Sequence, residues 1–97
     1  MLNWRVGHTD VWDNVRAYEA IFEEEATEDI NFYISFRVFM NNADEWHLGI
    51  IQTAPNKNAP IKTIKCYTPE VGKAMAEDEV KKILEGMKKV LDKYKCL

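Results

Sequence analysis

Residues 30–54 read INFYISFRVFMNNADEWHLGIIQTA, and this stretch decides the fold. Apolar and other residues alternate over residues 30–40, a pattern typical of a β-strand with one face in a core. The Asn- and Asp-rich residues 41–44 then indicate a turn, because these side chains bond their own backbone and tolerate left-handed conformations. A second alternating run over residues 46–54 completes an antiparallel hairpin.

The register of this hairpin follows from the residues that must share the core face. A loop of three residues (41–43) or of five (41–45) aligns the apolar rows of the two strands, which are Ile34, Phe36, Val38, Trp46, Leu48 and Ile50. A loop of four residues would bring His47 and Gly49 into the core row, because a one-residue slip exchanges the two faces of a strand.

The segment before the hairpin predicts an N-terminal helix over about residues 10–24. Thr9 and Asp10 supply an N-cap. Glutamates 23–25 would then oppose the dipole at the C-terminal end of this helix. Alternation within residues 1–8 leaves two readings, a short extra strand or an ordered arm. The apolar residues that recur at the spacing of one helical face are Val11, Val15, Tyr18 and Phe22.

The segment after the hairpin predicts a turn over residues 55–60, a third strand over residues 61–67 and a final helix from about Ala76. Gly72 weakens any helix before that point, so we expect residues 68–75 to form a connector. Ile64 and Cys66 should join the core face of the third strand. The apolar stripe of the final helix consists of Val80, Ile83, Leu84, Met87, Val90, Leu91 and Tyr94.

These elements predict a single α+β domain over residues 1–97. It would contain the N-terminal helix, a three-stranded antiparallel meander with the extra N-terminal strand as an option, and a long C-terminal amphipathic helix packed on the sheet. A length of 97 residues with 46% hydrophobic residues suits one globular domain. No apolar run approaches the ~20 residues of a membrane span, and the N-terminus lacks the pattern of a signal peptide. We therefore expect a cytoplasmic protein with no membrane partner.

The expected cytoplasmic location also predicts the state of the two cysteines, Cys66 and Cys96. We expect both to be thiols, with Cys66 buried, because intracellular cysteines stay reduced. A bridge that ties the last helix to the sheet is the alternative.

Charge is divided unevenly along the chain. Residues 1–50 carry three arginines against ten acids, a net charge of −7, whereas residues 51–97 carry ten lysines against six acids, a net charge of +4. A compact acidic surface can imitate a phosphate backbone and occupy the basic cleft of a nucleic-acid enzyme, as a small phage or mobile-element inhibitor would. The candidate acidic patch is Glu23, Glu24, Glu25, Glu28 and Asp29.

The second face of the predicted sheet combines aromatic, apolar and basic side chains, a composition typical of recognition surfaces. Three alternatives exist for this face: cover by the N-terminal helix, a partner or a second copy of the chain, or a platform on which nucleic-acid bases stack. For the platform, the stacking residues would be Tyr33, Phe39 and Tyr67. The candidate binding residues are Tyr33, Arg37, Phe39, His47, Ile51, Lys65 and Tyr67.

Catalytic chemistry has little support. His8 and His47 are the only histidines, and the predicted register directs His47 and Cys66 to opposite faces of the sheet. Metal-ligand spacings and phosphate-binding glycine loops do not occur in the sequence, so we expect neither a metal nor a cofactor. The leading hypothesis is a non-enzymatic protein-interaction module, an inhibitor or adaptor that binds another protein or a second copy of itself. A nucleic-acid-binding domain is the alternative, and a small enzyme with a histidine general base is the third.

Overall fold

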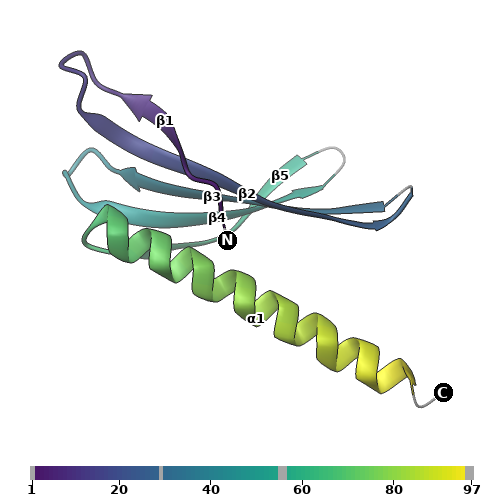
Figure 1. Ribbon diagram of the computed structural model, residues 1–97. Helices are drawn as coiled ribbons and strands as arrows, with labels where there is room; N and C mark the ends of the chain where they lie inside the picture. The colour runs from purple at the N-terminus through teal and green to yellow at the C-terminus, as the bar shows by residue number, and fades with distance from the viewer. Residues whose placement is uncertain (1, 29, 55–56, 96–97) are drawn as a thin grey trace.

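The computed structural model describes residues 2–28, 30–54 and 57–95. These residues form a five-stranded antiparallel sheet in the order β1-β2-β3-β4-β5, followed by one long helix (Figure 1). The fold is therefore α+β, as predicted, although the number of strands and the N-terminal element differ. The elements are β1 (Arg5–Thr9), β2 (Val15–Thr27), β3 (Ile30–Met40), β4 (Trp46–Ala54), β5 (Lys57–Lys65) and α1 (Pro69–Lys95).

The central hairpin has the predicted bounds and register. Met40 of β3 lies opposite Trp46 of β4, so the five-residue loop is the one that forms. The side-chain oxygen of Asn41 accepts hydrogen bonds of 3.0 Å from the amides of Ala43 and Glu45. The Asn41 side chain thus supplies hydrogen-bond partners for backbone amides of the loop, which have no partner in the strand ladder.

The prediction of an N-terminal helix was wrong, because these residues form β2. A period of two also fits this segment, since Tyr18, Ala20 and Phe22 alternate and lie opposite the core residues of β3. Pairing with β3 satisfies the backbone of β2 along nearly its whole length, and this long-range gain overrides the local helical pattern. In a strand, moreover, residues 23–25 no longer oppose a helix dipole.

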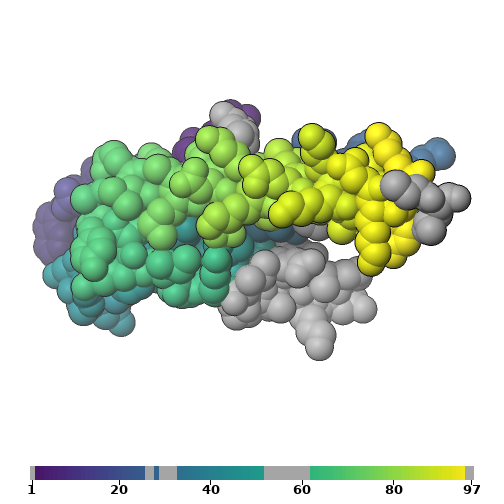
Figure 2. Space-filling view, turned by 90° about the horizontal axis from the view of Figure 1, so that it is seen from below, coloured from purple at the N-terminus to yellow at the C-terminus, as the bar shows by residue number. Residues whose placement is uncertain are grey.

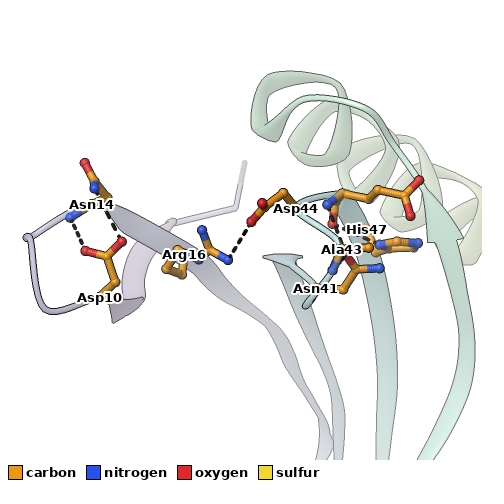
Figure 3. A network of polar contacts seen from close by, with 8 residues as sticks. Asp10, Asn14, Arg16, Asn41, Ala43, Asp44 and His47 are labelled. Atoms are coloured by element: carbon orange, nitrogen blue, oxygen red, sulfur yellow. Dashed lines mark hydrogen bonds and ion pairs between the residues drawn. The ribbon is translucent and has the colours of Figure 1, made fainter.

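The predicted N-cap residue Asp10 has the expected chemistry in a different backbone. Its Oδ1 accepts hydrogen bonds from the amides of Trp12 (2.9 Å) and Asn14 (3.0 Å), as Figure 3 shows in part. These bonds close the turn between β1 and β2, in which Asp13 takes a left-handed conformation with φ of 62°. Of the two readings for the N-terminus, the extra strand is the one that forms, as β1.

The C-terminal helix begins at Pro69, so the predicted connector over residues 68–75 was wrong. Thr68 Oγ1 accepts a hydrogen bond of 3.2 Å from the amide of Val71 and caps the first turn. Gly72 lies inside the helix, where its missing side chain allows α1 to approach the sheet closely. A Cβ at Gly72 would lie 2.8 Å from Cys66 Sγ and 2.9 Å from a methyl group of Val38.

The third strand of the predicted meander is β5, which begins and ends earlier than predicted. The predicted turn over residues 55–60 was too long, since Lys57 already belongs to β5. Pro60 lies opposite Ile51 beside a bulge, and β5 is an edge strand, where a proline removes no ladder hydrogen bond.

The core lies between α1 and one face of the sheet. Phe36, Val38 and Leu48 are fully buried there, together with Ala76 and Val80 of α1. The Cys66 thiol is buried among them as predicted, and desolvation raises its pKa. Cys96 lies outside the described residues. Within the described ranges, no helix has the length and apolar character needed to cross a membrane.

Gly72→Ala is expected to destabilise the fold. Overpacking against Cys66 and Val38 should cost about 1–3 kcal/mol, more than the ~1 kcal/mol that helix propensity returns. The matched control is Gly86→Ala in the same helix, where a Cβ would meet no described atom within 4 Å and only the propensity gain applies. Urea denaturation of both variants checks this, and equal stabilisation by the two changes would contradict the close approach at Gly72.

Candidate functional site: the open sheet face

One face of the sheet carries no second layer. Figure 1 shows α1 against the opposite face, and no other helix exists in the described part of the chain. Of the three alternatives for this face, cover by an N-terminal helix is wrong, since that segment is β2. The open face is built from the odd-numbered side chains of the central strands, as the register requires.

The predicted binding residues share this face but not one spot. Arg37 and Phe39 of β3 lie beside His47 and Ile51 of β4, and Lys65 of β5 lies opposite His47. The Phe39 and His47 rings stack with centroids 5.8 Å apart. Two further predicted residues lie at the margins of this group. Tyr33 is opposite Glu23, towards the far end of the β2–β3 hairpin, and the exposed Tyr67 follows the end of β5.

Gly49 creates a hollow in the middle of the open face. It lies between Arg37 on β3 and Thr63 on β5, so a gap replaces a side chain at the centre of three strands. The hollow measures about 270 Å³, and its wall includes the side chains of Phe39 and Ile51. A space of this size admits one protruding side chain of a binding partner.

A second hollow, of about 430 Å³, adjoins the first. Its lining includes His8 of β1 and Trp12 of the β1–β2 turn, and it shares Arg37 and Phe39 with the first hollow. Trp12 is 78% exposed at the tip of a turn that the Asp10 hydrogen bonds hold in shape. Arg37 and Phe39 thus form a ridge between two depressions.

The cations of the open face are already paired. Arg37 Nε lies 3.9 Å from Glu19, which also accepts an ion pair of 3.4 Å from Arg5. Lys65 forms an ion pair with Glu45. The hydrogen bond and positive charge of Lys65 lower the pKa of Glu45, and the same pair raises the pKa of Lys65. The face is therefore polar and mixed in charge rather than strongly basic.

The predicted acidic residues other than Asp29 lie on the arm, which is defined as residues 23–28 and 30–33 at the far end of the β2–β3 hairpin. Alternation along β2 divides them between the two faces: Glu23 and Glu25 share the open face with Tyr33, and Glu24 lies on the other face. Glu28 is exposed in the turn, and Asp29 lies outside the described residues. The patch is therefore a protruding acidic arm rather than one continuous surface.

The sequence-based analysis missed the two hollows. An isolated glycine inside a strand pattern, such as Gly49, was the available signal for the first, because it indicates a bulge or a close approach. The second hollow is lined by His8 and Trp12 of the β1–β2 hairpin, and this hairpin was not expected because residues 10–24 were predicted to be a helix. His47 and Cys66 do lie on opposite sides of the sheet, and no group of three or more His, Cys, Asp or Glu among the described residues is placed to hold a metal ion.

Removal of Lys65 should raise the pKa of Glu45 back towards its usual value. The pair favours the charged carboxylate, so its contribution to stability is complete above the ordinary pKa of a glutamate and is lost as pH falls through the lowered value. NMR titration of the Glu45 side chain in Lys65→Met measures the shift. Lys81→Met, on the exposed side of α1, is the control, and an unchanged midpoint in Lys65→Met would contradict the pairing.

Comparison with protein-family models, with curated proteins and with solved structures found no match to this chain.

Proposed function

We propose that the chain is a non-enzymatic protein-interaction module that binds its partner on the open sheet face. The observation that supports this most is the uncovered face with two hollows that meet at Arg37 and Phe39. An arginine and an aromatic ring between depressions is the composition of an interface hot spot, in which anchoring side chains fill pockets on the partner. The exposed Trp12 at the rim adds a third residue of the type enriched at interfaces.

A protein partner fits this face better than a nucleic acid does. Phosphate binding relies on cations that exchange counterions for phosphates, but Arg37 and Lys65 already have carboxylate partners. The aromatic residues proposed for base stacking are also spread out, with Tyr33 on the arm and Tyr67 beyond β5. A single-strand binder would instead align its rings along one charged groove.

Gly49→Thr should weaken binding without loss of fold. A threonine side chain fills the hollow, where its Cβ would lie 3.4 Å from the Phe39 ring, and its strand propensity favours β4 by up to about 1 kcal/mol. The probe is a set of peptides selected on the wild-type protein from a displayed random library. Their affinity, measured by fluorescence anisotropy, should fall about tenfold or more in Gly49→Thr, which corresponds to about 1.4 kcal/mol.

The control for this experiment is Glu70→Gln, an exposed change in the first turn of α1 that should leave affinity unchanged. Selected peptides that bind wild type and Gly49→Thr equally well would contradict the proposal. Labelled oligothymidylate tests the nucleic-acid alternative on the same samples. Tight binding that weakens steeply with salt and that Tyr33→Ala reduces would favour that alternative instead.

A further inference from the structure

The second half of α1 diverges from the sheet and exposes an apolar surface. Figure 1 shows this divergence, and Figure 2 shows the C-terminal part of the helix at one end of the molecule. Whereas Ala76 and Val80 are buried, the later residues of the same stripe are 40–58% exposed. The distal stripe is defined as Leu84, Met87, Val90, Leu91 and Tyr94.

The spacing of this stripe indicates another helix as its occupant. Val80, Leu84, Met87, Leu91 and Tyr94 follow one another at alternating intervals of four and three residues, so a single heptad pattern runs from the buried half into the exposed half. Such a pattern produces a narrow seam that suits helix–helix packing. A Cβ built at Gly86, beside the stripe, would meet no described atom within 4 Å, so this part of the helix surface is open in the single chain.

Charge complementarity identifies the source of that helix. The distal half of α1 is rich in lysine, whereas the arm that extends in the same direction in Figure 1 is acidic. Within one chain, the ion pairs of the described residues join no glutamate of the arm to these lysines. A second copy brings an acidic arm to the lysines and lysines to the acidic arm. The lysines are Lys88, Lys89, Lys93 and Lys95.

We propose that the chain forms a two-fold homodimer in which the distal stripes of two α1 helices pack antiparallel and the acidic arm of each copy faces the lysines of the other. An antiparallel arrangement brings Leu84 of one copy to Leu91 of the other. It also sets the helix dipoles in opposition, which is favourable. A parallel arrangement would instead place the two acidic arms side by side. This dimer is independent of the open sheet face.

Light scattering coupled to size-exclusion chromatography over a concentration series tests the dimer. The mass should rise from 11.3 kDa towards twice that value, and Leu91→Glu should remain monomeric at every concentration. Circular dichroism should show an intact fold in Leu91→Glu, because Leu91 is 57% exposed in the single chain. The control, Val71→Glu, places the same residue at a position that is 45% exposed in the first turn of α1, away from the distal stripe, and should dimerise. A wild type that stays monomeric, or a Leu91→Glu variant that dimerises normally, would overturn the proposal.

Two further measurements test the arrangement within the dimer. In a Cys96→Ser background, a mixture of Leu84→Cys and Leu91→Cys proteins should form mainly the mixed disulfide on oxidation, whereas dominant Leu84→Cys self-crosslinks would overturn the antiparallel order. Replacement of Glu24, the arm glutamate on the α1 side of the sheet, by lysine should raise the dimer dissociation constant, most strongly at low salt. An unchanged dissociation constant would overturn the role of the arm.

Discussion

The contact between β3 and the first half of α1 is the interaction on which the rest of the structure depends. Phe36 and Val38 are fully buried beneath Ala76 and Val80, and Gly72 allows the helix to come close enough to exclude water. The hydrophobic effect stabilises this layer in proportion to the apolar area removed from solvent. No other helix of the described chain assists, so one helix covers one face of one sheet.

This one-sided arrangement explains both candidate surfaces. A single helix leaves the second face of the sheet in contact with solvent, and that face is where Phe39, Ile51 and the hollow at Gly49 lie. The second half of the same helix diverges from the strands, so its apolar stripe continues past the core (Figure 1). The proposed partner and the proposed second copy therefore occupy different places, and the two contacts can form together.

The bounds and register of the central hairpin could be predicted from the local sequence pattern. Period-two alternation over residues 30–40 and 46–54 was sufficient for its bounds and for a register restricted to two loops, because side chains of a strand must alternate between core and solvent. The same logic brought Arg37, Phe39, His47, Ile51 and Lys65 to one face. The segment from Val11 to Phe22 was wrongly predicted to be a helix, because its apolar residues fit both a helical period and a strand period. In that segment the backbone conformation was decided by pairing with β3, a contact between residues distant in sequence.

By itself, the sequence determined the α+β class, the β3–β4 hairpin, the buried Cys66 and the amphipathic C-terminal helix, because each depends on residues close together in the chain. Tertiary structure alone decided that β2 is a strand, that Gly72 lies inside α1, and that the open face is hollowed at Gly49. Each of these depends on what lies opposite a residue across a strand pair or a helix–sheet contact. Periodicity describes which side chains share a face, but only packing decides what that face meets.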